Sequence, residues 1–278
     1  MAGTTVNPAQ TLADSAANRP KITVAVPSLN QGKFLEQALE SIAGQGLSVE
    51  IMLADGDSSD STRTVIERWR DRLAWSRSAP DNGQAAAINE AVGHGTAPYV
   101  CWLNADDTYL SHGLRVLADY LDRHPEAPAV YGRVWNTDEQ GRPTKPYWTS
   151  AFSEWRLARY CFISQPGTLI RREVWASVGG VDEGLHLAMD YDLWWKILRR
   201  FGPMAYVPEF VATNRVHGRT KTSSQRRAHY IEAMKTVKRH TGHVPLKWYL
   251  AWPWAVWVRT IWNRKRSVSH CGYGPYKY

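Results

Sequence analysis

Short apolar runs alternate with amphipathic stretches over residues 21–134 of the 278-residue chain. Four runs are predicted to be buried strands, at 22–26, 49–54, 73–78 and 99–103. The segments after the first three carry apolar residues at helical spacing or end in turn-forming strings that can cap a helix. Repeated strand–loop–helix units produce a mostly parallel sheet flanked by helices, so the pattern predicts an α/β fold.

The periodicity weakens after residue 134, where 136–141 resembles a hairpin tip. A helix is predicted at 191–201, a strand at 204–211 and a basic loop at 213–224. We therefore expect a disordered leader (1–20), an α/β domain (21–225) and a helical, aromatic and basic C-terminal extension (226–278). The change at residue 134 divides the domain into 21–134 and 135–225, which the family resemblance described below makes a nucleotide half and an acceptor half.

Polar side chains follow each of the four predicted strands. They are Pro27, Ser28 and Asn30; Asp55; Asp81, Asn82 and Gly83; and Asn104, Asp106 and Asp107. In an open α/β sheet the loops after the strands converge on one crevice, where ligands bind. Each group alone could be only a helix cap or a turn, but four groups at one rim favour a binding site.

Two common phosphate-binding motifs are missing from the sequence. The junction after the first strand reads PSLNQG at 27–32 and contains no GxGxxG, and the chain has no GxxxxGK[ST] loop. The sequence therefore lacks the main evidence that would identify it as a dinucleotide-dependent oxidoreductase or a P-loop enzyme.

The carboxylates after the fourth strand suit a divalent cation such as Mg²⁺ or Mn²⁺, which prefers oxygen ligands and can bridge two phosphates. Asp106 is the best candidate ligand. Asp107 is adjacent, so in extended backbone its side chain points to the opposite side and need not share that role.

Charge and composition narrow the class of protein further. The formal net charge is +8, and basic residues gather late in the chain, at 199–200, 215–227, 235–239 and 264–266. The sequence has no recognisable nucleic-acid-binding motif, and a carboxylate-rich rim would repel phosphate unless a metal intervened. Three widely spaced cysteines and a polar leader without a secretory pattern favour the cytoplasm.

Six segments together resemble the inverting family 2 glycosyltransferases of GT-A fold, over about residues 22–221. They are VPSLNQG at 26–32, LADGDSSD at 53–60, PDNGQ at 80–84, WLNADD at 102–107, GGVDE at 179–183 and MDYDLW at 189–194. The resemblance implies transfer of a sugar from a nucleotide-diphosphate sugar, with UDP or dTDP favoured, to an acceptor hydroxyl with inversion. The acceptor would be a glycan or a lipid-linked glycan in polysaccharide or surface-glycan synthesis.

The resemblance also implies roles for the strand-end residues. Pro27, Ser28 and Asn30 would line the nucleotide site, Asp55 would receive the base, and the turn at 81–83 would border nucleotide and sugar. The family's DxD motif falls on Asn104, Ala105 and Asp106, so Asp106 would bind the metal while Asn104 replaces its first carboxylate.

The family's catalytic base, the Asp of a Glu-Asp pair, falls on Asp190, and Met189 replaces the Glu. Asp190 and Asp192 differ by about 200° around a helix, so they cannot both face one substrate. The alternative is that either residue only caps the helix.

The resemblance also places the loop at 215–221 near the diphosphate. His217 could complete the metal shell, and Arg219 or Lys221 could neutralise the leaving phosphate. A solvated basic loop is the alternative. Trp148, Trp155 and Tyr160 could stack on an acceptor sugar, although aromatic residues in such positions are more often part of the core.

The Trp-rich segment 248–258 is too short to span a bilayer and is interrupted by Pro253. With the basic residues that follow, it could form an interfacial helix on the inner face of an anionic membrane, or a helix packed on the core. A second hypothesis for the whole chain is an inactive nucleotide-sugar-binding or scaffold protein, given Asn104 and Met189.

Overall fold

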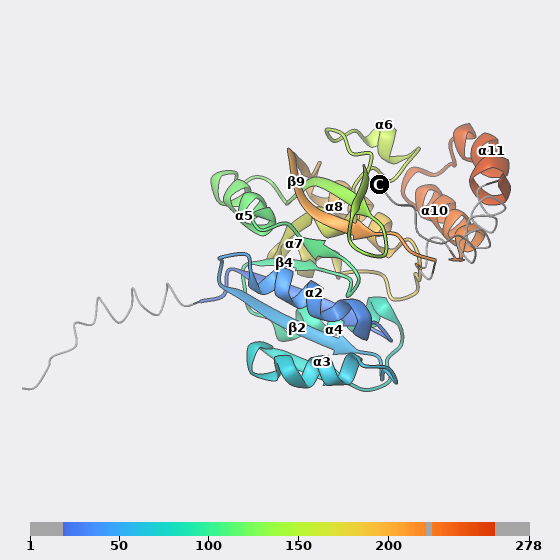
Figure 1. Ribbon diagram of the computed structural model, residues 1–278. Helices are drawn as coiled ribbons and strands as arrows, with labels where there is room; N and C mark the ends of the chain where they lie inside the picture. Colours follow the sequence, from blue (N-terminus) through green and yellow to red (C-terminus); the bar gives the residue numbers. More distant parts are fainter. Residues whose placement is uncertain (1–18, 219, 221–223, 259–278) are drawn as a thin grey trace, which may run out of the picture.

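The computed structural model describes residues 19–218, 220 and 224–258 (Figure 1). The predicted leader lies almost wholly outside the described residues. The basic tripeptide at 264–266 also lies outside them.

The first half of the chain forms the predicted parallel sheet. Its strands are β1 (Ile22–Ser28), β2 (Val49–Asp55), β3 (Trp75–Ser78) and β4 (Tyr99–Trp102), in the spatial order β3-β2-β1-β4. All four predicted strands are present. The third starts later than predicted, because a 3-10 turn, η1 (Arg70–Arg72), precedes it.

The second half continues the same sheet with mixed pairing. Its strands are β5 (Thr108–Tyr109), β6 (Ala129–Thr137), β7 (Pro143–Pro146), β8 (Thr168–Arg171) and β9 (Ala205–Arg215). β8 joins β4 and β6 in antiparallel pairing, whereas β6 and β9 run parallel. The predicted hairpin tip is confirmed between β6 and β7, and β6 crosses residue 134, so both halves share one continuous sheet.

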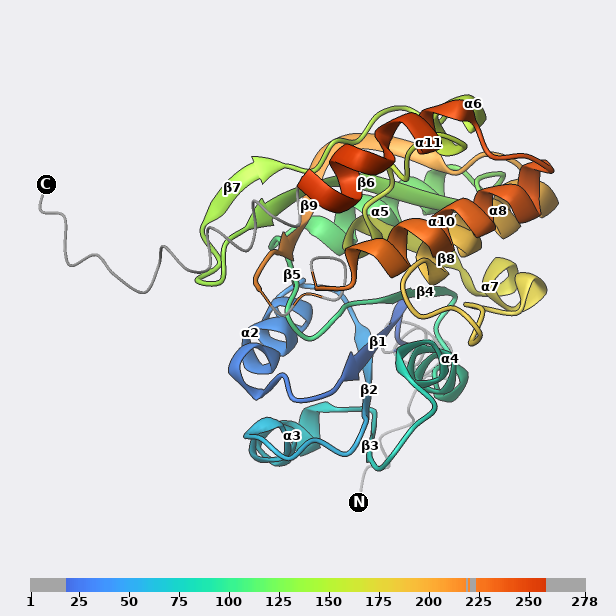
Figure 2. The ribbon, with the colours of Figure 1, turned by 90° about the vertical axis from the view of Figure 1, so that its right-hand side faces the viewer.

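Helices cover both faces of this sheet (Figures 1 and 2). They include α2 (Gly32–Ala43), α3 (Thr62–Trp69), α4 (Gln84–His94), α5 (Gly113–Arg123), α7 (Arg172–Val178) and α8 (Met189–Phe201). Alternate residues of β1 enter different cores, because successive side chains of a strand point to opposite faces. Val24 packs in the core with α2, α3 and α5, and Ala25 packs in the core with α4, α7 and α8.

Tryptophan side chains fill the space between β4 and the helices behind it. The ring of Trp102 on β4 stacks on Trp194 of α8 at 6.1 Å and meets Trp175 of α7 edge-on at 5.9 Å. Both Trp102 and Trp194 are fully buried. These rings fix the position of α8 against the end of β4.

Three helical segments end the described chain: α10 (Arg226–Thr241), α11 (Leu246–Trp252) and a π-helical turn, η3 (Pro253–Val258). α10 contacts α8, and Trp248 of α11 is buried and donates a hydrogen bond from Nε1 to the carbonyl of Ala158 at 2.8 Å. One side of the Trp-rich segment is therefore packed on the core. Among the described residues, no helix combines the length and apolarity needed to cross a membrane.

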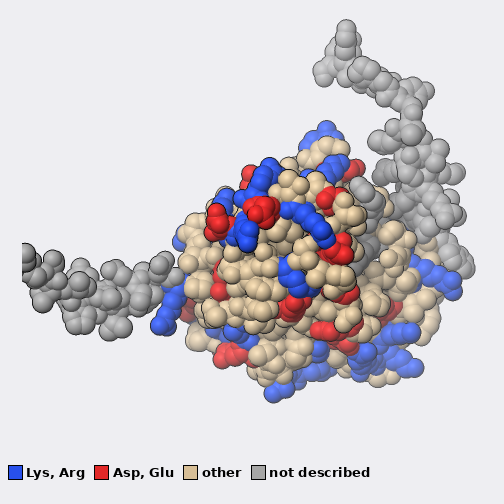
Figure 3. All heavy atoms as spheres, turned by 90° about the horizontal axis from the view of Figure 1, so that it is seen from below, with Lys and Arg blue, Asp and Glu red and all other residues tan. Residues whose placement is uncertain are grey.

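Charges alternate in sign on the face shown in Figure 3, where Lys and Arg lie interspersed with Asp and Glu. On α3 and its surroundings, Arg63 pairs with Asp57 and Arg68 pairs with Glu36. Such a mixed face gives no support to the nucleic-acid alternative, which needs a concentrated basic surface.

Candidate active site

The carboxyl ends of the parallel strands meet at one rim, as the sequence pattern predicts. Ser28 is the register partner of Asp55, and Asp55 is the partner of Ser78. On the other side of β1, the backbone N–H of Leu103 donates to the carbonyl of Ala25, which brings the Asn104 segment alongside.

At the end of β1, Ser28 has a buried hydroxyl without a partner among the described residues. An unsatisfied buried hydroxyl is costly, so this position favours a ligand that can bond to it. Asn30, two residues on, has a left-handed backbone (φ 53°), and its Oδ1 accepts a hydrogen bond from the Ser59 N–H at 2.9 Å. Pro27 is buried within β1, directly before Ser28.

Asp55 is fully buried, and its carboxylate organises the rim. It accepts hydrogen bonds from the backbone N–H and the hydroxyl of Ser58 and from the hydroxyl of Ser78, the last at 2.6 Å. Sequence reasoning missed both serine partners. Asp55 is therefore a buried carboxylate at the rim whose two oxygens are both engaged by the protein.

The turn after β3 folds back over the loop after β2. Asp81 accepts a hydrogen bond from the Gly83 N–H at 2.8 Å, and its other oxygen lies 3.0 Å from where a Cβ would stand at Gly56. Gly83 has φ +106°, a conformation that favours glycine. Asn82 is exposed at the tip.

Asn104 acts as a bridge, and its position explains why an amide serves there. Its Oδ1 accepts from Gln84 Nε2 at 2.7 Å, while its Nδ2 donates to Asp107 at 3.3 Å and to Gln165 Oε1 at 3.4 Å. An aspartate at 104 has no N–H to donate to Asp107 and Gln165, so the amide fits both contacts. Ala105, which lies between Asn104 and Asp106 in the sequence, is buried.

Asp106 and Asp107 have different surroundings, although the backbone at 104–107 forms a turn, closed by a hydrogen bond from the Asp107 N–H to the Asn104 carbonyl, and is not extended. Asp107 is buried and accepts a hydrogen bond from the backbone N–H of Arg215 at 2.8 Å. Burial, together with the neighbouring Asp106 charge, raises the pKa of Asp107 well above its usual range. Asp106 instead meets His217, with Oδ2 and Nε2 at 3.0 Å.

The Asp106–His217 pair fits a divalent metal with few protein ligands. The described residues contain no cluster of three or more His, Cys, Asp or Glu side chains that could enclose an ion. Mg²⁺ and related ions are often held by one or two protein ligands together with substrate phosphates and water, which matches this pair. Arg219 and Lys221, the predicted diphosphate ligands, lie outside the described residues.

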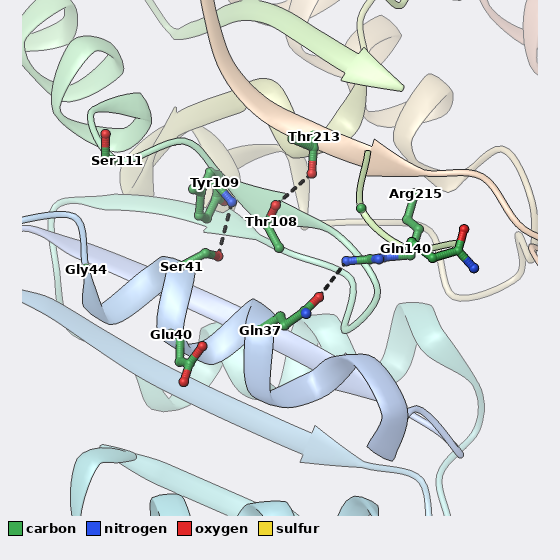
Figure 4. Close-up of a pocket in the computed structure, with 11 residues that line it drawn as sticks. Gln37, Glu40, Ser41, Gly44, Thr108, Tyr109, Ser111, Gln140, Thr213 and Arg215 are labelled. Carbon is green, nitrogen blue, oxygen red and sulfur yellow. Dashed lines mark hydrogen bonds between the residues drawn. The ribbon is translucent and has the colours of Figure 1, made fainter. Parts of the chain in front are cut away.

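Arg215 is a buried anchor of the site. It is the last residue of β9, so the loop predicted at 213–224 begins only after it, and the alternative of a solvated loop does not hold for this residue. Its Nε donates to the Asp106 carbonyl and its Nη1 to the Glu139 carbonyl, both at 2.8 Å, and its Nη2 donates to Gln37 Oε1 at 2.9 Å. The same guanidinium borders a polar groove of about 510 Å³ between α2 and β9 (Figure 4). None of the site residues predicted from the sequence lines that groove.

Asp190 begins α8 and is partly buried beside Tyr147 and Cys161. It accepts a hydrogen bond from the Tyr191 N–H at 2.7 Å, and burial raises its pKa to about 6, with a further contribution from the charge of Glu232. A carboxyl with a pKa near the working pH suits general-base chemistry.

Asp192 faces the other way, as the helix geometry predicts. It is buried and pairs with His240 Nε2 at 2.8 Å and with Arg239 Nη1 at 3.3 Å, both on α10. This carboxylate holds α8 against α10, and Asp190 is the one of the two that is left beside the acceptor-half residues.

Glu232 of α10 holds the backbone that leads into Asp190, and sequence reasoning missed it. Its Oε1 accepts hydrogen bonds from the backbone N–H groups of three consecutive residues, 186–188, at 2.8 to 2.9 Å. These N–H groups belong to the turn that leads into α8, and they make no hydrogen bonds within that helix. Met189 is buried in the core. The carboxylate near Asp190 is therefore that of Glu232, on a helix that is distant in sequence but packs on α8.

Gln165 connects the strand-end rim to a short 3-10 turn, η2 (Gln165–Gly167). Its Nε2 donates to the Trp102 carbonyl at 2.6 Å, and its Oε1 accepts from Asn104. The Trp102 ring stacks on Trp194, which lies one turn after Asp190 on α8. The helix that carries Asp190 therefore packs against the strand that leads into the rim.

The fold and its strand-end rim are those of a glycosyltransferase of GT-A type. The family model for glycosyl transferase family 2 matches residues 23–179, more than half of the chain. The chain belongs to that family, and it is a glycosyltransferase with a mixed α/β GT-A fold.

Two relatives show how far the sequence similarity extends. An uncharacterized glycosyltransferase of Methanocaldococcus jannaschii is 21% identical over 233 residues, which cover 80% of each chain. A PGL/p-HBAD biosynthesis glycosyltransferase of Mycobacterium bovis is 28% identical over 179 residues, 62% of this chain and 68% of the relative.

Two solved structures are similar in fold. S. aureus TarS 1-349 in complex with UDP-GlcNAc has a TM-score of 0.65 at 18% identity, covering 79% of this chain and 66% of that longer one. The mannosyltransferase PcManGT from Pyrobaculum calidifontis, in complex with GDP-Man and Mn²⁺, has a TM-score of 0.64 at 21% identity, covering 92% and 77%.

Proposed function

We propose that this glycosyltransferase uses a nucleotide-diphosphate sugar, with UDP or dTDP favoured, and inverts the anomeric configuration in one displacement. The observation that carries the proposal is Asp190, a partly buried carboxyl with a pKa of about 6 on α8, the helix whose Trp194 stacks on Trp102 at the end of β4. Two of the similar structures are complexes with nucleotide sugars, UDP-GlcNAc and GDP-Man, which supports a donor of this class.

In this proposal the donor nucleotide lies along the rim. The free hydroxyl of Ser28 and the backbone around Asn30 contact it, Asp55 supports the base from below, and the turn at 81–83 covers the sugar-proximal side. Asn104 and Ala105 place the following carboxylate. These residues contribute by positioning the donor, which can lower a barrier by several kcal/mol.

Asp106 and His217 would hold Mg²⁺ or Mn²⁺, and Arg215 fixes the backbone of Asp106. When bound, the metal neutralises charge on the diphosphate. Arg219 and Lys221 are proposed as further cations for the leaving group. The Mn²⁺ complex of the Pyrobaculum mannosyltransferase supports a divalent ion in this fold.

Asp190 is proposed to accept the proton of the acceptor hydroxyl as its oxygen attacks the anomeric carbon. The C–O bond to the diphosphate breaks as the new one forms, so configuration inverts. Glu232 keeps the turn before Asp190 in place. A carboxyl of raised pKa is a stronger base than an ordinary aspartate and is still ionised at neutral pH.

We propose a glycan or lipid-linked glycan as the acceptor, as part of polysaccharide or surface-glycan synthesis. Trp148, Trp155 and Tyr160 are exposed, so the expectation that such aromatics belong to the core was wrong for these three. Tyr160 lies close to Tyr147, which borders Asp190, so an acceptor sugar could stack near the base.

Thermal shift with UDP, GDP, dTDP and CMP and their sugars, each with Mn²⁺, Mg²⁺ or chelator, tests the donor site, because a ligand of the native state raises its apparent stability. Stabilisation by one nucleotide family that depends on metal supports the proposal and identifies the donor class. The absence of any shift would favour the alternative of an inactive scaffold. A thermal shift without sugar transfer to any acceptor tested would support the alternative of an inactive nucleotide-sugar-binding protein.

A further inference from the structure

Exposed apolar side chains concentrate on two segments that touch each other. Ten large apolar side chains are exposed in the described part of the chain, and seven of them lie within 147–160 and 246–254. They are Trp148, Trp155, Tyr160, Leu246, Tyr249, Leu250 and Trp254. We call this group the α6–α11 surface, after α11 and the short helix α6 (Glu154–Leu157), which Figure 2 shows together at one end of the molecule.

Contacts between the two segments make this surface continuous. The hydrogen bond from Trp248 to Ala158 joins α11 to the end of α6, and Lys247 Nζ lies 5.8 Å from the centre of the Tyr160 ring. Tyr160 in turn meets Trp148 edge-on at 5.3 Å. Contiguous exposed apolar surface of this kind marks an interaction site rather than scattered hydrophobic residues.

α11 has apolar side chains on two faces, and only one of them packs on the protein. Trp248 is buried and Trp252 packs against Tyr230 of α10. Leu246, Tyr249 and Leu250 recur at helical spacing on the outer face, and Leu250 is 72% exposed. Packing on the core, one of the two interpretations of this segment from the sequence, therefore applies to one face of α11, and the opposite face is exposed.

Cations surround the surface and nearly no acid opposes them. Arg159 lies over the exposed Trp155 ring at 4.0 Å, and Arg156 and Lys247 are exposed nearby. The one acid within 147–160 and 246–258, Glu154, pairs with Arg199 at 2.8 Å. The sequence after 258 adds five Lys or Arg and no Asp or Glu. Aromatic residues beside such basic clusters suit the headgroup region of an anionic bilayer.

We infer that the α6–α11 surface docks the enzyme on an anionic lipid bilayer. Tyr191, the residue after Asp190, donates a hydrogen bond from its hydroxyl to the carbonyl of Leu157 on α6, so docking would bring the proposed base close to the membrane. This inference rests on the proposed function. Of the two proposed acceptors it favours the lipid-linked glycan, whose sugar can reach Asp190 while its lipid stays in the bilayer.

Co-sedimentation of the full chain with vesicles tests this inference, using phosphatidylglycerol–phosphatidylcholine mixtures and pure phosphatidylcholine. We expect binding to the mixed vesicles that weakens with salt. Leu250→Glu should partition at least about tenfold more weakly, because it removes an apolar side chain that would enter the bilayer and adds a negative charge that the anionic lipids repel. Phe201→Glu is the matched control, since Phe201 is an exposed apolar residue at the far end of α8, and it should bind as the wild type does.

Absence of binding by the wild type, or equal loss in both variants, would overturn the inference. A wild-type dimer in light scattering that Leu250→Glu dissociates, without vesicle binding, would assign the surface to a second copy of the chain instead. Salt dependence of wild-type binding keeps the test valid even where Leu250→Glu fails to fold. Thermal shift by donor nucleotides without vesicles separates a failure of docking from a failure of the proposed function.

Discussion

Replacing Asp190 by Asn should remove activity and at the same time stabilise the fold at neutral pH. The folded protein raises the pKa of this carboxyl from 3.8 to about 6, a difference of about 2 units. One unit corresponds to about 1.4 kcal/mol, so ionised Asp190 costs up to about 3 kcal/mol of folding free energy. Because the folded state binds this proton more tightly, the cost is absent below about pH 4, grows up to about pH 6, and is complete above it.

The neutral amide of Asp190→Asn escapes this cost. We expect its free energy of unfolding to exceed that of the wild type by about 1–3 kcal/mol at pH 7.5, with the difference vanishing near pH 4. Sugar transfer should fall about 10²- to 10⁴-fold, the usual contribution of a general base, while donor binding is retained. Urea unfolding at both pH values and a nucleotide-release assay with acceptor measure these quantities.

Asp192→Asn is the matched control, because it makes the same change two residues away on α8. Asp192 is buried and pairs with His240 and with the exposed Arg239, so its replacement leaves these donors without their carboxylate and should destabilise the protein by about 1–3 kcal/mol. The two variants should therefore change stability in opposite directions at pH 7.5. Retained turnover in Asp190→Asn, or a loss of stability in it at pH 7.5, would refute the reasoning.

Three further changes test the supporting contacts of the site. Glu232→Gln keeps an acceptor for the turn before α8 but removes a charge that raises the Asp190 pKa, so the acid limb of the pH–rate profile should move to lower pH; an unchanged limb would contradict this. His217→Ala should abolish the Mn²⁺-dependent part of donor stabilisation in thermal shift, while any metal-independent part remains. Arg215→Met should lower the free energy of unfolding by about 3–5 kcal/mol, because Arg215 is a buried cation with three side-chain hydrogen bonds, and normal urea stability would exclude this role.

The first half of the fold was predictable because its signals are local. Each strand of the parallel sheet is a short apolar run that ends in polar residues, and each following helix has its own apolar periodicity. Parallel topology then brings Ser28, Asp55 and Asn104 to one rim without further information. The separate surroundings of Asp106 and Asp107 were expected from extended backbone, but a turn at 104–107 produces them instead.

The contacts that hold the site together were not predictable, because they join residues far apart in the sequence. Arg215 reaches Asp106 across 109 positions and Gln37 across 178, and a basic string in the sequence does not distinguish a buried arginine from a solvated one. Glu232 likewise shows no pattern that ties it to residues 186–188. Exposure of Trp155 depends on which helix packs beside it, which periodicity in a four-residue helix cannot decide.

The two departures from the family pattern have physical counterparts in the structure, and these bear on whether the chain is an enzyme. At position 104 the amide donates to the buried Asp107, a contact that a carboxylate could not make. At position 189 a core methionine takes the place of the family's Glu, and Glu232 supplies a carboxylate to the same region. Asp190 remains partly buried at a cost to folding, although an amide would relieve that cost. A site that keeps a destabilising carboxyl held in place by a second one is typical of catalysis, where strained groups are tolerated for function, and it is not required by a binding scaffold.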